Sequence, residues 1–516
     1  MARRFKSLRS DPLPSYDAVI IGAGVGGLVC ANLLARAGLQ VLLVEQHYMV
    51  GGYCSAFKRK GFLFDAATHF YPLLGNPATL TGKVLAEVGV DTTWIKMDTV
   101  DQFHFPDGTK FSVSADFNTY VTRLKREFPH ESHAIAAFFA VVQRVYMLGL
   151  LRFFRGRPTE QLRPYLKSSV QDALDTYFHD PKLKLLLTAD TGHWGSPPAR
   201  TSFVFDSMLR LAYFLGNYYP KGGSQAFSDE LASRFEEGGG HILMSSLVTR
   251  IQVRDQTACG VEIETGIGLK RRRINVRAEQ VISNADLLQT MERMVPNADP
   301  VYTSTLKQLR PSLPCFVMHV GLQGISTKIL EDVQGYHWSS WDPNDVATDA
   351  FKIFVPTLFD REIAPSGGHI LIVQKITDID YHAIKDWPGH KAAVDNYLTT
   401  NLERLIPGFS DHVVVKLSAS ALTSQRYTLN HCGAMLGWEL APDQLGDDRP
   451  DVISPVKNLY FVGHWTQPGG GITPVMVSAI RVAQLITGVR DSRIATLPLS
   501  PAISAVGRPV APEMSA

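Results

Sequence analysis

The spacing of apolar residues changes twice between residues 17 and 45. Residues 18–21 are continuously apolar, as in a strand that is buried on both faces. A glycine-rich turn follows, then a helical apolar pattern as far as Gly38, and then a second apolar run over residues 41–44. These are the parts of a βαβ unit, so the pattern predicts an α/β fold with a parallel sheet.

The turn inside this unit carries a nucleotide-binding pattern. Gly22 suits the tight turn, Gly24 lets the backbone approach a pyrophosphate, and Gly27 lets the helix pack close to the strand. The helix directs its free N–H groups and the positive end of its dipole at the phosphates. Glu45 stands 21 residues after Gly24, where its carboxylate can accept hydrogen bonds from ribose hydroxyls. The pattern predicts a dinucleotide site and leaves NAD and FAD both open.

A second glycine pair, Gly51 and Gly52, follows Glu45. Glycines at this point permit another close approach of the backbone to the cofactor. The longer pattern resembles the FAD-binding signature of the flavin amine oxidase and phytoene desaturase superfamily, which favours FAD. Many members have Arg or Lys directly after the two glycines, where this chain has Tyr53.

The segment over residues 61–71 contains Asp65 and His69 in the spacing FD-x-x-x-H. It resembles an element of retinol saturase-like and carotenoid-processing members of the superfamily, in which it passes close to the flavin. His69 is therefore the titratable side chain that we expect beside the flavin. Two roles stay open for it: a proton donor or acceptor, or a side chain that packs on the flavin or forms a hydrogen bond with it.

A block in the middle of the chain strengthens the resemblance. Residues 219–286 contain, in order, the YPxGG, helix, V-x-x-I and VIxNAD elements of the phytoene desaturase family. The resemblance implies that Val248 lies against the adenine end of FAD. It also implies that the backbone at Asn284 is within reach of the cofactor.

Residues 458–480 form the last block and are typical of a strand, a glycine loop and a helix. They resemble the LYxVG and PGxGI signature of carotenoid desaturases. Thr473 suits the N-cap and Pro474 the first helical position, so the helix can direct N–H groups at the flavin ring and stabilise negative charge on it. The chain has His464 where many members have Asp, and Thr473 where several have Pro.

These blocks cover most of the chain, which is identified as a member of the phytoene desaturase, carotenoid isomerase and retinol saturase family. The resemblance implies a two-dinucleotide-binding-domain flavoprotein fold of the amine oxidase type, in which a Rossmann-type FAD-binding domain is interleaved with an α+β substrate domain. The expected division is a disordered basic N-terminus over 1–15; a discontinuous FAD-binding domain over 16–118, 220–290 and 441–490; an apolar helical region for substrate or membrane association over 119–219; a substrate domain with a mixed sheet over 291–440; and a disordered tail over 491–516.

The expected cofactor contacts come from the glycine turns and from the family elements that follow them. They are Gly22, Ala23, Gly24, Gly26, Gly27, Glu45, Gln46, Gly51, Gly52, Tyr53, Thr68, His69, Val248, Asn284, Gly463, His464, Gly471, Ile472 and Thr473.

The resemblance implies FAD redox chemistry on the carbon–carbon double bonds of a long apolar polyene or isoprenoid, by desaturation or saturation of a carotenoid or retinoid. In such chemistry the cofactor carries the hard step, and the protein supplies orientation and excludes water. The sequence contains no Ser-His-Asp, metal or paired-carboxylate motif and no second βαβ repeat for NAD. Alternatives are a carotenoid cis–trans isomerase that uses reduced FAD, a flavin amine oxidase, and a lipid- or carotenoid-binding flavoprotein without turnover.

Residues 134–151 are apolar enough to be tested as a membrane span, but Gln143 and Arg144 interrupt them. Three arginines then surround Phe153 and Phe154 (Arg152, Arg155 and Arg157). Such a basic and aromatic cluster suits a helix that lies at a bilayer surface, and the alternative is a core helix with a solvated basic end. The expected location is peripheral, on the cytoplasmic side of a membrane.

Composition removes other classes of partner. Of 516 residues, 51 are basic and 49 acidic, so the small net charge of +2 does not suggest a nucleic acid. The five cysteines are scattered without a CxxC pair, which argues against a disulfide framework and a zinc site. The basic N-terminus lacks the apolar core of a secretory signal, whereas organelle import stays open.

Overall fold

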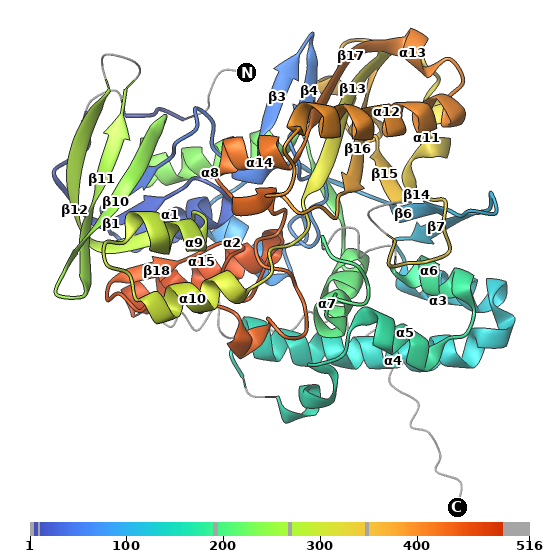
Figure 1. The fold of residues 1–516 in the computed structure, drawn as a ribbon, viewed down its shortest axis with the longest axis horizontal. Helices are drawn as coiled ribbons and strands as arrows, with labels where there is room; N and C mark the ends of the chain where they lie inside the picture. The colour runs from blue at the N-terminus through green and yellow to red at the C-terminus, as the bar shows by residue number, and fades with distance from the viewer. Residues whose placement is uncertain are drawn as a thin grey trace, which may run out of the picture.

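The computed structural model describes residues 5–8, 11–157, 159–188, 195–266, 271–345 and 350–488. The expected tail over 491–516 lies outside these residues. The described residues contain two seven-stranded sheets and a group of helices beside them (Figure 1).

The first sheet has the strand order β10-β11-β12-β1-β2-β9, with β18 also paired to β12. The pairs of β1 with β2 and β12, β2 with β9, and β12 with β18 are parallel, whereas β11 pairs antiparallel with β10 and β12. The strands are β1 (Ser15–Ile21), β2 (Val41–Val44), β9 (His241–Leu243), β10 (Ser246–Arg254), β11 (Thr257–Thr265), β12 (Arg272–Ser283) and β18 (Leu459–Phe461). Three distant parts of the chain therefore build one sheet.

Helices cover both faces of this sheet, which is why β1 and β2 read as continuous apolar runs. One face carries α1 (Val25–Arg36), α8 (Ser224–Glu237) and α15 (Ile472–Thr487), with α2 (Leu80–Glu87) in the same core. The opposite face carries α9 (Leu287–Gln289) and α10 (Pro300–Gln308). The expected Rossmann-type domain is present.

The second sheet has the order β17-β13-β16-β15-β14-β6-β7. The strands are β6 (Thr99–His104), β7 (Lys110–Ser114), β13 (Cys315–Gln323), β14 (Gly335–Trp338), β15 (Ala350–Phe354), β16 (Gly368–Ile376) and β17 (Val413–Ala419). One face packs on α11 (Thr327–Val333), α12 (Trp387–Leu405) and α13 (Phe409–His412). The β6–β7 hairpin belongs to this sheet through β14, so the expected domain boundary at residue 118 does not coincide with the sheet boundary.

The helical region lies beside the second sheet, and its longest helix runs along one edge of the molecule (Figure 1). It contains α3 (Phe117–Glu127), α4 (Ser132–Gly149), a π-helical turn (Leu150–Phe154), α5 (Val170–Tyr177), α6 (Pro181–Thr188) and α7 (Phe203–Phe214). Among the described helices one stretch, Pro129–Phe154, has the length and composition of a membrane span, and 39% of its most apolar window is buried in the protein. Phe138 and Phe139 anchor it in the core that it shares with the second sheet.

Four shorter elements connect these units. Strands β3 (Ala56–Arg59) and β4 (Phe62–Asp65) form one antiparallel pair, and β5 (Trp94–Lys96) and β8 (Tyr218–Pro220) form another.

The N-terminal segment corrects an expectation, because residues 5–8 are not a disordered tail. Phe5 is buried in the core around α8, and the Leu8 amide donates to the Ile242 carbonyl at 2.8 Å. An apolar side chain within the basic segment gives it a place to pack beside β9.

Candidate active site

The glycine turn after β1 is held in a shape that only glycine permits. Gly22 has φ +95°, and a Cβ on Gly27 would lie 2.2 Å from the Gly22 carbonyl oxygen. The close contact lets α1 begin at Val25, directly after the strand, so that its first amides face the cavity lined by Gly22, Gly24 and Gly26.

Glu45 is fixed beside this turn by backbone hydrogen bonds. Its two oxygens accept from the Ala23 amide at 2.7 Å and the His47 amide at 2.8 Å. Burial raises the pKa of the Glu45 carboxyl, and these hydrogen bonds oppose the rise. The carboxyl lines the cavity at the end of β2, where the sequence places a ribose acceptor.

Asn284 joins the two glycine turns that lie far apart in the sequence. Its Nδ2 donates to the Gly22 carbonyl at 3.2 Å, and its Oδ1 would lie 2.8 Å from a Cβ on either Gly26 or Gly463. That Cβ on Gly26 would also lie 3.3 Å from the Gly463 nitrogen. The ends of β1, β12 and β18 therefore meet at one point, as parallel strands of one sheet do.

The last helix begins earlier than the sequence predicts. α15 starts at Ile472 with Gly471 at the N-cap, so the expected cap Thr473 lies in the first turn. The Thr473 hydroxyl is buried, lines the cavity and has no hydrogen-bond partner among the described residues. The glycine reaches φ +102°, which lets it take the cap position, and the threonine hydroxyl is left facing the cavity.

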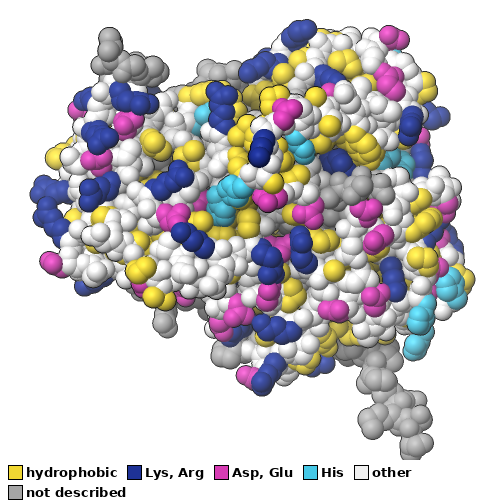
Figure 2. Space-filling model, viewed as in Figure 1, with side chains coloured by type: hydrophobic (Ala, Val, Ile, Leu, Met, Phe, Trp, Pro, Cys, Tyr) yellow, Lys and Arg dark blue, Asp and Glu magenta, His cyan; other side chains and the backbone are white. Residues whose placement is uncertain are grey.

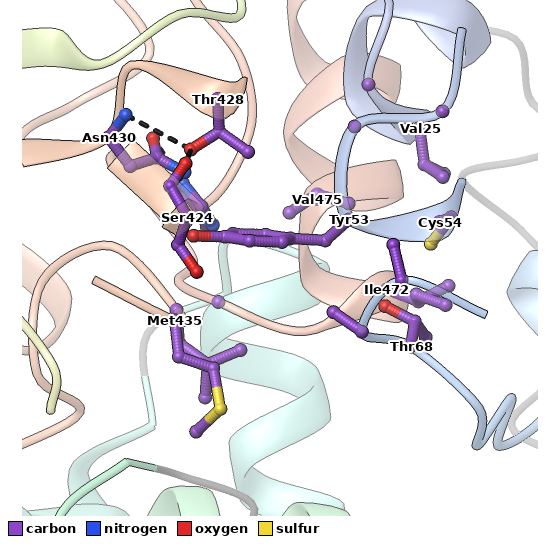
Figure 3. Close-up of a pocket in the computed structure, with 18 of the residues that line it drawn as sticks. Val25, Tyr53, Cys54, Thr68, Ser424, Thr428, Asn430, Met435, Ile472 and Val475 are labelled. Carbon is purple, nitrogen blue, oxygen red and sulfur yellow. Dashed lines mark hydrogen bonds between the residues drawn. The ribbon is translucent and has the colours of Figure 1, made fainter. Parts of the chain in front are cut away.

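Tyr53 extends into the cavity from the turn after Gly52 (Figure 3). Its hydroxyl donates to the Ala434 carbonyl at 2.9 Å. Burial raises the pKa of this hydroxyl, and hydrogen bonds with Asn430, Thr428 and Ser424 oppose the rise. The tyrosine that stands in place of a cation therefore fastens the segment after α14 (Ala421–Thr428) across the cavity.

His464 is a neutral, partly buried ring in this structure. Its Nε2 lies 3.3 Å from the Asn430 Oδ1, and burial lowers its pKa to about 4. It is among the residues that line the cavity.

His69 also lines the cavity as a neutral imidazole. Its Nδ1 donates to the Ala67 carbonyl at 2.9 Å, and its ring stacks on Phe354 with centroids 4.4 Å apart. Burial, followed by the nearby Lys352 charge, lowers its pKa to about 3. Its Nε2 is buried without a partner among the described residues and is an acceptor in this tautomer.

One cavity of about 640 Å³ contains all the expected contacts except Ala23 and Gly27, which support the turn from behind. Beyond the glycine turns the same cavity continues into an apolar chamber. Its walls are one face of the second sheet, the end of α4 and α7: Cys315, Val317, Trp338, Ala350, Ile376, Tyr146, Leu150, Phe154, Phe205, Met208 and Leu209. The volume falls within the range of pockets that enclose small ligands.

Two supporting residues were not predicted from the sequence. Arg449 is 2% exposed and donates to the carbonyls of Trp438, Glu439, His464 and Thr466, which shapes the glycine loop before α15. Burial lowers its pKa to about 9. Asn430 accepts from the Trp465 indole at 2.8 Å. Neither residue stands in a periodic or motif context, so no sequence signal marks it.

The family model described as flavin containing amine oxidoreductase matches residues 25–487. The chain belongs to this family. FAD is the cofactor of this oxidoreductase. The predictions of family, fold class and cofactor are confirmed.

Two named relatives match along most of the chain. Prolycopene isomerase 1 of Oncidium hybrid cultivar is 26% identical over 505 residues, which cover 91% of this chain and 84% of that protein. The all-trans-retinol 13,14-reductase of Danio rerio is 25% identical over 505 residues, which cover 87% of this chain and 82% of that protein.

Solved structures show the same fold. An oxidoreductase from Methanosarcina mazei has a TM-score of 0.64 at 19% identity, covering 90% of this chain and 99% of that chain. Putrescine oxidase bound to putrescine has a TM-score of 0.64 at 16% identity, covering 92% of this chain and 99% of that chain.

The residues of the site fit FAD. The first turns of α1 and α15 both open on the cavity, and Thr473 leaves a buried hydroxyl there for a ligand. A Cβ would fill the space at Gly26 and at Gly463, so both turns are kept clear for close approach of a cofactor. Gly22, Gly24 and Glu45 would hold the adenosine and phosphate side, and Gly471, Ile472 and Thr473 the flavin side.

Proposed function

We propose that this flavoenzyme acts on carbon–carbon double bonds of a long apolar polyene or isoprenoid, by desaturation or saturation. The observation that carries the proposal is the continuity of one cavity from the glycine turns to an apolar chamber between α4, α7 and the second sheet. Relatives whose names refer to prolycopene and to retinol support the same class of substrate.

Bound FAD would supply hydride transfer, and the chain would orient the polyene and exclude water. Apolar side chains from three elements form most of the chamber wall. The Lys352 ammonium on that wall is already buried in an ion pair with Asp101, so a hydrocarbon can lie there without removing a solvated charge from water. His69 presents an acceptor at Nε2 and holds its own proton on Nδ1. Its low pKa supports a role in positioning the flavin or substrate and opposes a role as proton donor at neutral pH.

The charges of the cavity argue against an amine substrate. The carboxylates in its described lining are Glu45 and Asp286. Glu45 is held by two backbone amides, and Asp286 is held by His431, with 2.6 Å between its Oδ2 and the histidine Nδ1. An ammonium group would meet Lys352 in the chamber instead of a carboxylate.

Isomerisation with reduced FAD is the second candidate. It requires no net uptake or release of a proton. This agrees with the neutral His69 and with Glu45 and Asp286, whose carboxylates are already engaged in hydrogen bonds. Prolycopene isomerases from three plants are 24–26% identical over 91% of this chain.

The two candidates differ in the mass and the electron count of the product. Purified FAD-loaded enzyme is offered carotenoids and retinoids in micelles, once with a flavin oxidant and once after anaerobic flavin reduction. We expect a product two mass units lighter or heavier, with longer or shorter conjugation. A product of unchanged mass formed by reduced enzyme supports isomerisation, whereas flavin bleaching by simple amines alone contradicts both candidates.

We also propose that the exposed face of α4, together with the π-helical turn after it, lies on a membrane surface, from which the polyene enters. Ala136, Ala137 and Ala140 are exposed on this apolar helix, and Arg144 follows them. The half-buried Leu150 and Phe154, in the π-helical turn that follows α4, line the cavity. An apolar face with arginines beside it suits the boundary between lipid headgroups and acyl chains.

A further inference from the structure

The face of the second sheet that lines the chamber carries a group of polar side chains in an otherwise apolar wall. Lys352 of β15 is directly paired in the sheet with Tyr336 of β14 and Gln374 of β16. Trp338 lies two residues after Tyr336, so its side chain is on the same face. Lys352, Trp338 and Gln374 all line the cavity.

Lys352 carries a positive charge into this wall, and the carboxylate of Asp101 balances it. It forms an ion pair with Asp101 of β6, and both side chains are at most 5% exposed. Its ammonium also lies 4.0 Å from the centre of the Phe70 ring and 4.5 Å from that of Tyr336. These contacts hold the cation in the wall, where a buried charge would otherwise be costly.

Two neutral polar groups beside Lys352 have no partner among the described residues. Trp338 is only 6% exposed, and its Nε1 is buried without a hydrogen-bond partner. The Gln374 amide is partly accessible and forms no hydrogen bond within that same part of the chain. A buried donor without an acceptor costs about 1–3 kcal/mol, so a ligand that supplies the acceptor is favoured.

We propose that this group of side chains, Lys352, Trp338 and Gln374, binds an uncharged oxygen at one end of the polyene. A hydroxyl oxygen can accept from the Trp338 Nε1 and donate to the Gln374 Oε1, and a carbonyl oxygen can accept from Trp338 and from the Gln374 amide. The inference rests on the proposed function and narrows its substrate to alcohols or aldehydes of polyenes.

The charge balance distinguishes this oxygen from a carboxylate. Asp101 already neutralises Lys352, so a carboxylate would add an uncompensated negative charge inside an apolar wall. A hydrocarbon end would leave the Trp338 and Gln374 groups unsatisfied. The site therefore favours an alcohol end over a carboxylate end and over a hydrocarbon end.

The test measures binding of three probes to the FAD-loaded enzyme: all-trans-retinol, its deoxy hydrocarbon and retinoic acid. Quenching of tryptophan fluorescence gives the Kd of each, without dependence on turnover. We expect wild-type enzyme to bind the alcohol more tightly than the acid. The ratio of hydrocarbon Kd to alcohol Kd should fall about 5- to 10-fold in Gln374→Leu and in Trp338→Phe, as the loss of one hydrogen bond of ~1 kcal/mol implies.

Ile376→Val is the matched control, because Ile376 is an apolar residue on the same face of β16, and it should leave the ratio unchanged. Each variant is first checked for bound FAD, which shows that it is folded. The preference of the wild-type enzyme for the alcohol over the acid is a separate readout that does not depend on any variant. An unchanged ratio in both polar variants, or equal binding of alcohol and acid by wild type, overturns this inference and leaves the polyene chemistry standing. Failure of all three probes to bind overturns both proposals.

Discussion

Asn284 is the residue through which the two halves of the cofactor site are joined. Its amide reaches Gly22 on one side, and its carbonyl oxygen leaves no room for a side chain at Gly26 or Gly463 on the other. The sequence marks these three glycines as turn residues, whereas only the structure shows that one side chain lies against all three. The tolerance of a turn for a methyl group therefore depends on a residue far away in the sequence.

Gly463→Ala should reduce FAD affinity at least tenfold and destabilise the protein by about 1–3 kcal/mol. The added Cβ would lie 2.8 Å from the Asn284 Oδ1, and the backbone has φ +102°, where alanine is strained. Flavin absorbance after gel filtration measures retained FAD. Gly38→Ala is the matched control because Gly38 has φ +90° but nothing within 4 Å. Equal FAD loss in both variants would contradict the role assigned to Asn284.

At the scale of elements, the alternation of side chains on the second sheet separates two environments. On β13, Cys315 and Val317 face the chamber, whereas Phe316 and Met318 face α11 and α12. Both faces are apolar, so the strand reads as one continuous run and the sequence does not reveal which face meets the substrate. The packing of α12 on one side decides that the other side becomes the wall.

The membrane proposal depends on the exposed face of α4. The double variant Ala137→Glu and Ala140→Glu should lower co-sedimentation with vesicles that contain anionic lipid, because two carboxylates would be placed in the headgroup region. Retained FAD shows that the variant is folded.

A matched control for this experiment is available on α12. Ala392→Glu and Ala393→Glu add the same charge at exposed positions of a helix on the second sheet. If these changes reduce vesicle binding as much as those on α4, the effect is one of net charge, and the proposed surface is wrong.

At the scale of the whole molecule, four histidines that are buried or partly buried link folding to pH. Burial lowers the pKa of His69 and His337 to about 3 and that of His319 and His464 to about 4, from an ordinary value of 6.5. The unfolded chain therefore binds more protons than the folded one in the interval between those values. The stability that comes from keeping these rings neutral is present above about pH 6.5 and is lost as the pH falls toward 4.

The free energy of unfolding should decrease between pH 6.5 and 4. Each of these rings adds about 1.4 kcal/mol per pH unit to the slope where it is protonated in the unfolded chain and neutral in the folded one. Urea denaturation of FAD-loaded protein at several pH values measures this slope. His337→Phe should make the slope shallower by about one proton, since His337 stacks on Phe351 and lies outside the cavity. A slope that is unchanged in this variant would show that His337 does not stay neutral in the fold.

Sequence order and spatial order differ most in how the chain divides into units. The hairpin of β6 and β7 follows the first glycine turns in the sequence but pairs with β14, more than 200 residues later. The alternation of apolar and polar residues around Asp107 and Gly108 is enough to predict a hairpin. A hairpin depends only on its own turn and on the pleat of its two strands. The partner sheet of that hairpin depends on which edge strand is free, and local pattern carries no such information.

The sequence by itself determined the βαβ unit, the glycine turns, Glu45, the family and FAD, because the geometry of a phosphate-binding turn is encoded over about 30 adjacent residues. The tertiary structure alone decided the neutral state of His69, the role of Asn284 and Arg449, and the polar group around Lys352. These features arise where burial and partners come from segments hundreds of residues apart. A pKa or an unsatisfied donor is a property of such surroundings and cannot be read from neighbours in the chain.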